Sequence, residues 1–254
     1  IDGKSFGDEL ERIGYAGPEQ PGARDVSAYF ELHIEQGPIL EAEEKTIGIV
    51  TRAQGQRWYE ITIIGQESHA GPTPMPRRRD ALVAGSKIIQ EVQNIGHRYA
   101  PNACATVGHI QAYPNSRNVI PGKVFLTVDF RHPDDNQLTT MDTDLKTFCN
   151  NLELTDNINV DLVNFWNFPA TLFDDDCIDA VKQGAKIGGY QHMEIVSGAG
   201  HDAVYLAGRV PTAMIFVPCE NGISHNEIEN VTPEDCSAGC QVLLHAVLTR
   251  AENQ

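Results

Sequence analysis

The middle of this 254-residue chain carries six alternating elements, and their order limits the possible fold more than any other feature. Hydrophobic periodicity predicts strands over residues 57–64, 104–112, 123–130 and 157–165, and helices over about 79–95 and 135–151. The order β-α-β-β-α-β is typical of a split unit in which four antiparallel strands carry two helices on one face. An edge strand of such a sheet can pair with a second chain, so the unit is suited to dimerisation.

The sequence on both sides of this unit also alternates between helix and strand patterns. Strands are predicted over 28–33, 46–50, 193–196 and 213–217, and helices over about 174–187, 202–207 and 233–250. Thr232 and Pro233 suit the N-cap and the first position of the last helix. We therefore expect an α/β fold in which residues 1–52 and 171–254 form one domain and residues 53–170 are inserted into it.

Composition narrows the class of partner. Hydrophobic residues make up 41% of the chain, yet no run approaches the roughly 18 apolar residues of a membrane span. The formal net charge of −16 argues against nucleic acid and anionic membranes, because both are bound through clustered Lys and Arg. The six cysteines are scattered and form no Cys-x-x-Cys pair. We expect a small-molecule substrate and a cytoplasmic protein.

Two histidines stand in short polar segments beside apolar strand patterns. His33 belongs to Glu-Leu-His-Ile-Glu-Gln-Gly-Pro at 31–38, and His225 to Gly-Ile-Ser-His-Asn-Glu at 222–227. Neutral imidazole is the commonest metal-binding side chain, but histidines so far apart in sequence do not define a metal site by spacing. Each can equally be an ordinary histidine with a local hydrogen bond.

Four longer segments accompany these histidines: Gly-Gln-Glu-Ser-His-Ala-Gly-Pro-Thr-Pro-Met at 65–75, Asn-Ser-Arg-Asn-Val-Ile-Pro-Gly at 115–122, Asp-Phe-Arg-His-Pro at 129–133 and Ser-Gly-Ala-Gly-His-Asp-Ala at 197–203. Together the six segments resemble the M20-type metal-dependent amidohydrolases. The similar branch contains N-carbamoyl-L-amino-acid hydrolases, allantoate amidohydrolases and beta-ureidopropionases. The resemblance runs from about residue 25 to the end of the chain.

The resemblance implies a dinuclear metal centre and an inserted lid that forms a homodimer. On this basis His33 and His225 are ligands of two different divalent ions, zinc or manganese. Gln36 matches a substrate-contacting glutamine, and Glu35 is expected to be structural. His69 resembles a lid histidine that enters the active site of the partner subunit, where it binds substrate and stabilises the tetrahedral intermediate.

Four further residues are expected to bind substrate. By resemblance Asn118 and Arg131 hold its carboxylate end, and a guanidinium suits this role because it donates two parallel hydrogen bonds. Gly200 and His201 lie in a Gly-rich turn before a helix, where backbone N–H groups can meet an anion.

Two alternatives stay open for these residues. His69 can be a turn histidine that bonds its own backbone. Arg131 can pair with a structural acid, Asp129 or Asp134.

One departure from the family pattern is large. The family carries a His-x-Asp metal motif, a bridging aspartate and a Glu-Glu pair upstream of the position of His33, and none of these precedes it here. The pair His132 and Asp134, and the pair Glu43 and Glu44, are expected to be solvated surface groups. The chain therefore resembles a partial catalytic domain that lacks the N-terminal part, with too few donors for a dinuclear centre.

These observations predict a hydrolase that cleaves the ureido C–N bond of N-carbamoyl-L-amino acids, with the given chain inactive by itself. Allantoate amidohydrolase is the close alternative. A non-catalytic dimerising or binding module is the alternative from a different class, and an M20-type peptidase is disfavoured because Asn118 and Arg131 suit a small carboxylate.

Overall fold

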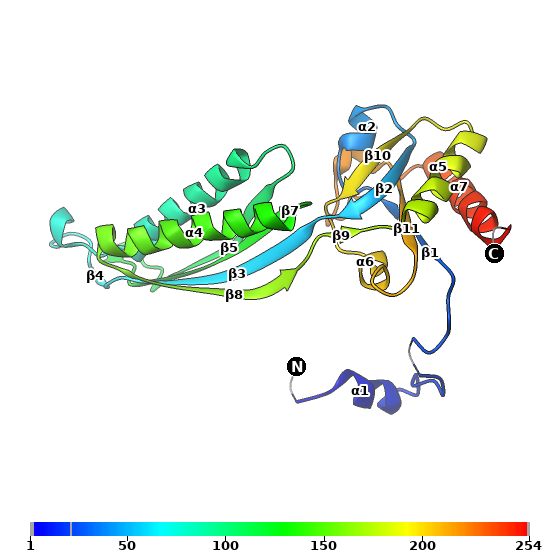
Figure 1. Ribbon diagram of the computed structural model, residues 1–254. Coiled ribbons are helices and arrows are strands. Elements are labelled where there is room, and N and C mark those ends of the chain that lie inside the picture. The colour runs from blue at the N-terminus through cyan, green and yellow to red at the C-terminus, as the bar shows by residue number, and fades with distance from the viewer. Residues whose placement is uncertain (1–2, 21, 253–254) are drawn as a thin grey trace.

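The computed structural model describes residues 3–20 and 22–252, which form two large β-sheets with helices packed against them and one two-stranded sheet (Figure 1). The four-stranded sheet and its helices extend as a long arm from the five-stranded sheet (Figure 1). In the described part of the chain, no helix combines the length and apolar character needed to span a lipid bilayer.

The arm contains the predicted β-α-β-β-α-β elements: β3 (Gly55–Ile64), α3 (Ala81–Arg98), β5 (Cys104–Tyr113), β7 (Lys123–His132), α4 (Asp135–Asp156) and β8 (Asn159–Phe168). Its strands lie in the order β5-β7-β3-β8, and each neighbouring pair is antiparallel. The predicted order of elements is confirmed, and each predicted span overlaps the observed one.

The core of the arm follows from the alternation along β3. Tyr59, Ile61 and Ile63 point to the same face because side chains alternate along a strand, and all three are fully buried. Apolar faces of α3 and α4 cover them. Asp80 and Asp134 start the two helices, since each carboxylate accepts a backbone N–H in the first turn.

The second sheet consists of β1 (Tyr29–Ile34), β2 (Ile47–Ala53), β10 (His192–Ser197) and β11 (Thr212–Val217), with the short β9 (Thr171–Leu172) on β2. Its order is β1-β11-β2-β10. The outer pairs are parallel, whereas β11 and β2 are antiparallel. Every residue of β11 is buried, as expected of a central strand covered on both faces.

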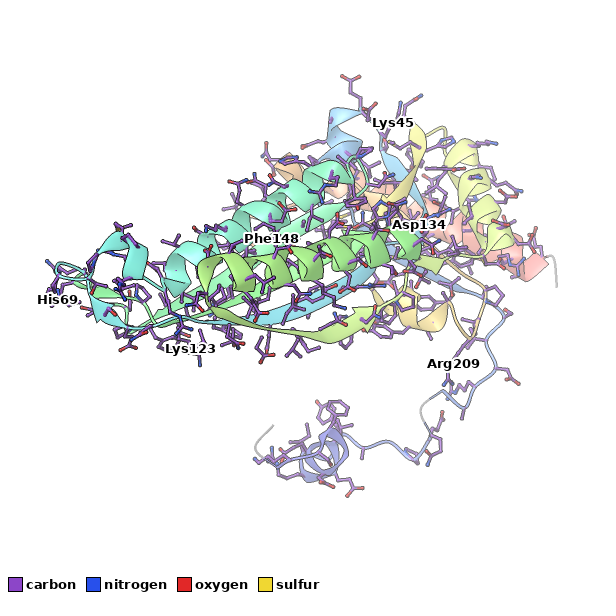
Figure 2. The ribbon with its side chains drawn as sticks, turned by 60° about the vertical axis from the view of Figure 1, so that its left-hand side comes forward. Lys45, His69, Lys123, Asp134, Phe148 and Arg209 are labelled. Carbon is purple, nitrogen blue, oxygen red and sulfur yellow. The ribbon has the colours of Figure 1, made fainter. Side chains whose placement is uncertain are left out.

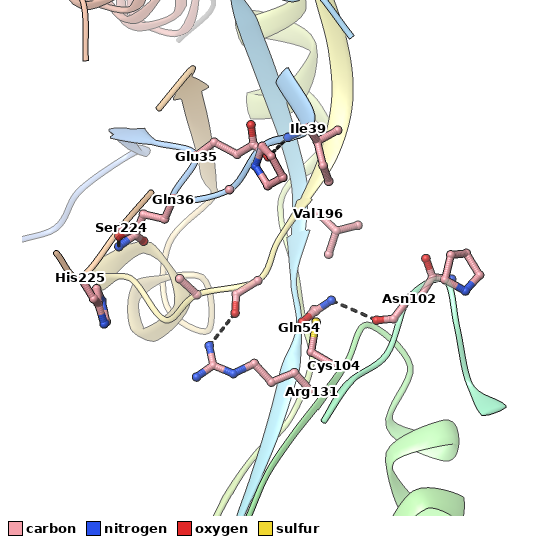
Figure 3. A pocket seen from close by; sticks show the side chains of 15 residues that line it. Glu35, Gln36, Ile39, Gln54, Asn102, Cys104, Arg131, Val196, Ser224 and His225 are labelled. Carbon is pink, nitrogen blue, oxygen red and sulfur yellow. Dashed lines mark hydrogen bonds between the residues drawn. The ribbon is translucent and has the colours of Figure 1, made fainter. Parts of the chain in front are cut away.

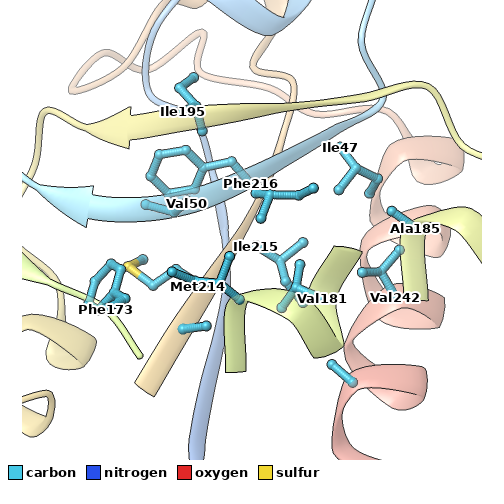
Figure 4. Close-up of a cluster of buried hydrophobic side chains, with 14 of the residues drawn as sticks. Ile47, Val50, Phe173, Val181, Ala185, Ile195, Met214, Ile215, Phe216 and Val242 are labelled. Carbon is cyan, nitrogen blue, oxygen red and sulfur yellow. The ribbon is translucent and has the colours of Figure 1, made fainter. Parts of the chain in front are cut away.

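Two helices, α5 (Asp175–Ile187) and α7 (Pro233–Glu252), pack against this sheet and each other. Figure 4 shows Val181 of α5 and Val242 of α7 facing Ile215 of β11 in the core. Thr232 caps α7, since its hydroxyl accepts the Asp235 N–H at 3.1 Å, so the predicted start of this helix is confirmed.

Several short elements were not predicted: α1 (Phe6–Arg12), α2 (Ile39–Ala42), β4 (Ser68–His69), β6 (Val119–Ile120), β9, and the 3-10 turns η1 (Met75–Arg77) and η2 (Glu220–Gly222). The helix α6 (Asp202–Leu206) was predicted. Helix α1 has no buried residue and lies apart from both sheets (Figure 1).

The arm joins the five-stranded sheet through two tightly packed connections, one from β2 to β3 at Gly55 and one from β8 to β9 at Ala170. A Cβ at Gly55 would lie 2.7 Å from Leu138 Cδ1 and 2.8 Å from the Ala170 nitrogen, so no larger side chain fits without movement. The Asp135 carboxylate accepts the Ala170 N–H at 2.9 Å. Both connections are therefore held against the start of α4.

Candidate active site between the two sheets

A pocket of about 500 Å³ lies where the arm meets the five-stranded sheet (Figure 3). Its lining from the sheet side includes Gln36, Val196, Gly198, Ala199, Ser224 and His225, and its lining from the arm and the connection includes Gln54, Pro101, Asn102, Cys104 and Arg131. Three residues predicted from sequence, Gln36, Arg131 and His225, thus line the same pocket. We call it the inter-sheet pocket.

One corner of the pocket brings two distant loops together. Gln36 and His225 both have left-handed backbones, with φ of 60° and 58°, which is uncommon for residues other than glycine. The Gln36 Nε2 donates to the Ser224 hydroxyl at 3.1 Å. Gly222 permits this approach, because its φ is 64° and a Cβ there would lie 2.7 Å from Pro38. Strained backbones held by such packing are typical of binding sites.

Glu35 supports this corner from beneath. It is buried, and its two carboxylate oxygens accept the backbone N–H groups of Ile39 and Leu40, both at 2.8 Å. These bonds satisfy N–H groups at the start of α2. The structural role predicted for Glu35 is confirmed.

His33 is the last but one residue of strand β1, near the same corner. Its Nδ1 lies 2.9 Å from the Ile34 carbonyl oxygen. A carbonyl can only accept, so Nδ1 carries the proton and the lone pair is on Nε2. Metal-binding histidines commonly have this arrangement, with one ring N–H donated to a backbone carbonyl. The state of the His33 ring is therefore compatible with a metal ligand.

The carboxylate of Glu229 interacts electrostatically with both predicted metal ligands, His33 and His225. Hydrogen bonding from Ser224 and from the His225 N–H, which is 3.0 Å from Oε2, lowers the pKa of the Glu229 carboxyl. The charges of His225 and His33 lower it further, so both imidazoles lie within electrostatic range of this exposed carboxylate.

The donor set does not complete a metal centre. Within residues 3–20 and 22–252, no three His, Cys, Asp or Glu side chains are grouped in a way that could hold a metal ion. A dinuclear hydrolytic centre requires more donors than two imidazoles. His33 and His225 fit the chemistry of metal ligands, but they do not form a site by themselves.

Arg131 stands at the opposite side of the pocket, at the end of β7. Its guanidinium donates to Asp129 through Nε and Nη2, the latter at 2.7 Å, and through Nη1 to the Gly198 carbonyl oxygen at 2.6 Å. The pairing with Asp129, left open from the sequence, is thus present. Three of the five guanidinium N–H donors are engaged, which leaves two for a ligand.

His69 and Asn118 lie together at the far tip of the arm. Strands β4 and β6 pair there, with His69 opposite Val119, and both side chains are exposed. Figure 2 shows His69 at the end of the arm away from Asp134, which follows Arg131 closely in the chain. A single chain therefore does not bring His69 and Asn118 to the inter-sheet pocket.

Each tip residue makes a local hydrogen bond. The Gly71 N–H donates to His69 Nδ1 at 3.0 Å, which is the backbone-bonded turn histidine considered above. The Ser116 hydroxyl donates to Asn118 Oδ1 at 2.8 Å. His69 Nε2 and the Asn118 amide N–H groups have no hydrogen bond to the protein that the structure describes, so they can still contact another molecule.

His201 lies inside the protein rather than on the pocket wall. Only 2% of its side chain is exposed, its Nε2 is 2.9 Å from the Ser197 hydroxyl, and its ring contacts His33 with a centroid distance of 4.7 Å. Burial, with the charge of His33, lowers the pKa of His201 to about 4, so the ring is neutral near pH 7. Gly200 lines a smaller, adjoining cavity that shares Gln54 and Ala199 with the inter-sheet pocket. The predicted substrate-binding roles of these two residues remain predictions.

Two pairs were expected from the sequence to be solvated surface groups, Glu43 with Glu44 and His132 with Asp134, and they differ in burial. Glu43 and Glu44 are exposed, as expected. His132 is not a surface group: it is only 6% exposed, and its Nδ1 accepts the Asp134 N–H at 3.0 Å. The expectation was wrong for His132 because the position ends β7 and faces the packed connection to α4.

Sequence reasoning missed several residues of the inter-sheet pocket, chiefly Gln54, Asn102 and Cys104. They belong to no recognisable chemical motif, and only the approach of the arm to the sheet brings them together. Ser224 stands in the segment 222–227 that was singled out, but it was given no role there. The Gly-rich turn at 197–203 was singled out, but the part of it that lines the pocket is Gly198 and Ala199.

Comparison with known proteins places this geometry in context. The chain is 47% identical to an N-carbamoyl-L-amino-acid amidohydrolase of Rhizobium meliloti, over 99% of this chain and 60% of that protein. It is 35% identical to an allantoate amidohydrolase of Escherichia coli, over 95% of this chain and 59% of that protein. The chain thus spans about three fifths of the length of these relatives.

A solved structure agrees with these relatives. The fold superimposes with a TM-score of 0.92 on an amidase of the hydantoinase/carbamoylase family from Burkholderia multivorans, at 58% identity, covering 99% of this chain and 61% of that one. The family model for peptidase family M20/M25/M40 matches residues 8–249. The chain therefore belongs to peptidase family M20/M25/M40.

Proposed function

We propose that the protein hydrolyses the ureido C–N bond of N-carbamoyl-L-amino acids. The observation that carries this proposal is the inter-sheet pocket, in which a guanidinium with free N–H groups faces a corner formed by Gln36 and His225. The relative from Rhizobium meliloti, an N-carbamoyl-L-amino-acid amidohydrolase, supports this choice of substrate.

The residues of the pocket suit different parts of such a substrate. Arg131 would bind the α-carboxylate through the guanidinium N–H groups that Asp129 and Gly198 leave free. Pairing with Asp129 fixes the orientation of the guanidinium before substrate arrives, which lowers the entropy cost of binding. Gln36 would contact the ureido group at the other corner.

The proposal includes two divalent ions, zinc or manganese, with His33 and His225 as ligands of different ions. Such ions, when bound, polarise a carbonyl and lower the pKa of water. The Ile34 carbonyl holds the His33 ring in the tautomer that such a role requires. Further donors would have to join these two imidazoles, because the described residues do not gather a third.

We also propose that the protein acts as a homodimer through its arm. The edge strand β5 exposes Ile110 and Tyr113, and its backbone can pair with another strand. A second copy would allow the tip residues His69 and Asn118 of one chain to approach the pocket of the other. There His69 would bind substrate and stabilise the tetrahedral intermediate.

A direct test measures ammonia release from an N-carbamoyl-L-amino acid, with and without added zinc or manganese. The proposal expects metal-dependent, saturable turnover that falls at least about a hundredfold in His225→Ala, which removes a metal ligand. The matched control is His97→Ala, an exposed histidine on α3 outside the pocket. Faster turnover of allantoate would select the close alternative, and efficient dipeptide cleavage would overturn the substrate assignment.

One observation favours a second candidate, a non-catalytic binding and dimerising module. Two imidazoles are too few for a hydrolytic centre in the described chain. Binding of an N-carbamoyl-L-amino acid without turnover at any metal concentration would support this candidate. Binding is therefore measured alongside turnover.

A further inference from the structure

Gln54 holds a central position in the inter-sheet pocket that the proposed function does not use. It lies between β2 and β3, and its backbone N–H donates to the Ser197 carbonyl oxygen at 2.9 Å. Figure 3 shows its side chain between Asn102 and Arg131. The residue thus touches both walls of the pocket.

The chemistry of its neighbour fixes the orientation of the Gln54 amide. Nε2 donates to the Asn102 carbonyl oxygen at 3.1 Å, and a carbonyl oxygen can only accept. The other amide atom is therefore the acceptor Oε1. This atom is buried and has no hydrogen-bond partner among the protein atoms that the structure describes.

The Gln54 acceptor belongs to the same wall as Arg131. A Cβ at Gly198 would lie 3.9 Å from Gln54 Oε1, and the carbonyl of Gly198 accepts from Arg131. Cys104, also in the pocket, is directly opposite Arg131 in the strand register. A substrate whose carboxylate binds Arg131 would place its α-substituent toward Gln54 and Cys104, and its ureido group toward the Gln36 corner.

We propose that Gln54 selects substrates whose α-substituent carries an N–H donor, such as a carboxamide or a second ureido group, over substrates with an aliphatic substituent. This inference rests on the proposed function, because it takes Arg131 to hold the carboxylate of an N-carbamoyl amino acid. It adds the class of substrate side chain, which neither the fold nor the family assigns.

The physical reason is the cost of leaving a buried acceptor without a donor. Such an acceptor costs free energy for as long as it has no donor, so a ligand group that donates a hydrogen bond to it gains affinity over one that does not. An aliphatic substituent cannot do so, whereas an amide N–H can. We expect a preference of roughly tenfold, the ratio that about 1.4 kcal/mol produces.

The test compares two ligands of nearly equal shape, N-carbamoyl-L-asparagine and N-carbamoyl-L-leucine. Their dissociation constants are measured by titration calorimetry on the full chain, so the readout does not require turnover. The wild type is expected to bind the asparagine derivative about tenfold more tightly, and Gln54→Leu is expected to abolish or reverse this ratio. Gln54→Met, a second variant of similar size, should behave like Gln54→Leu.

The control is Gln183→Leu, which makes the same change at an exposed position on helix α5, outside the arm and the pocket lining. It should leave the ratio unchanged. An equal ratio in wild type and both Gln54 variants, or binding of neither ligand by the wild type, would overturn the inference. Absence of hydrolysis with a ratio that responds to Gln54 would instead contradict the proposed catalytic function and leave the inference standing.

Discussion

The two ends of the arm differ in how their polar side chains are held. At the pocket end, Arg131 is bound by Asp129 and by Gly198 of the other sheet. At the tip, the side chains of His69 and Asn118 are exposed, and the hydrogen bonds that they make lie within their own turns. The comparison indicates that the pocket end is held by contacts between the two sheets, whereas the tip side chains are held only by local contacts, which is why we propose that they serve a second copy.

The largest loss of substrate affinity is expected from a substitution at the pocket end of the arm. Arg131→Ala removes the proposed carboxylate contact and should weaken binding of an N-carbamoyl-L-amino acid at least roughly thirtyfold, equivalent to about 2 kcal/mol. Arg131→Lys should recover little, because a lysine cannot donate two parallel bonds. Calorimetric titration checks both variants.

The control for this prediction lies on the same strand. Lys123 begins β7, is exposed and sits over the Tyr113 ring. Lys123→Ala should leave affinity within about twofold of wild type, since this end of the strand is remote from the pocket. Equal losses in the two variants would indicate a general charge effect instead of a defined site.

The next effect tests whether the tip serves a second copy. If the protein is a dimer that shares residues, His69→Ala should reduce turnover or binding roughly tenfold, although the residue lies outside the pocket of its own chain. Mixing His69→Ala chains with Arg131→Ala chains should then restore part of the lost function, because each heterodimer contains one intact site and heterodimers make up about half of the dimers in an equal mixture. Analytical ultracentrifugation establishes that the mixed species forms.

If turnover and binding do not recover when the two variants are mixed, the tip of one chain does not contribute to the site of the other. An unchanged His69→Ala variant would show that the tip has no part in the site. Either result would leave the pocket end of the comparison intact.

A smaller effect concerns the middle of the arm, between its two ends. Tyr59 is fully buried and its hydroxyl donates to Asp142 at 2.9 Å. Tyr59→Phe leaves this buried carboxylate with one fewer donor and should lower the free energy of unfolding by about 1–3 kcal/mol. Binding in the pocket should not change, since neither residue lines it.

Urea denaturation measures this prediction, with Leu154→Ala as its control. Leu154 is 84% exposed on α4, so its truncation should change stability by less than about 0.5 kcal/mol. A larger cost for Leu154→Ala than for Tyr59→Phe would contradict the assignment of the core of the arm.

The sequence was sufficient to predict the fold because its long elements have strong periodicity. Each strand of the four-stranded sheet and each helix over ten residues was placed within a few positions. The short elements, such as α2 and β4, were missed because two to four residues carry no measurable period. Their conformation depends on tertiary contacts, such as the bonds from Glu35 to the start of α2.

The site was less predictable than the fold. Gln36 and His225 were identified because they stand in recognisable segments, and both line the pocket. Gln54 and Cys104 belong to no such segment, and they join the pocket only because the arm packs beside the turn at Gly198. The burial of His201 was also not predictable, since it depends on contacts with Ser197 in its own turn and with His33 of β1.

The central claim is that the inter-sheet pocket binds the substrate, and the modification rate of Cys104 tests it most directly. Cys104 is exposed and lines the pocket, so it is the probe. Cys236 and Cys240 are exposed on α7 and serve as reactive controls. Burial raises the pKa of Cys149 to about 12, so the Cys149 thiol should react slowly at pH 8.

Peptide mass spectrometry after brief alkylation measures the rate at each cysteine. The account predicts that saturating N-carbamoyl-L-asparagine slows modification of Cys104 several-fold and leaves Cys236 unchanged. Equal rates at Cys104 with and without bound ligand would contradict it.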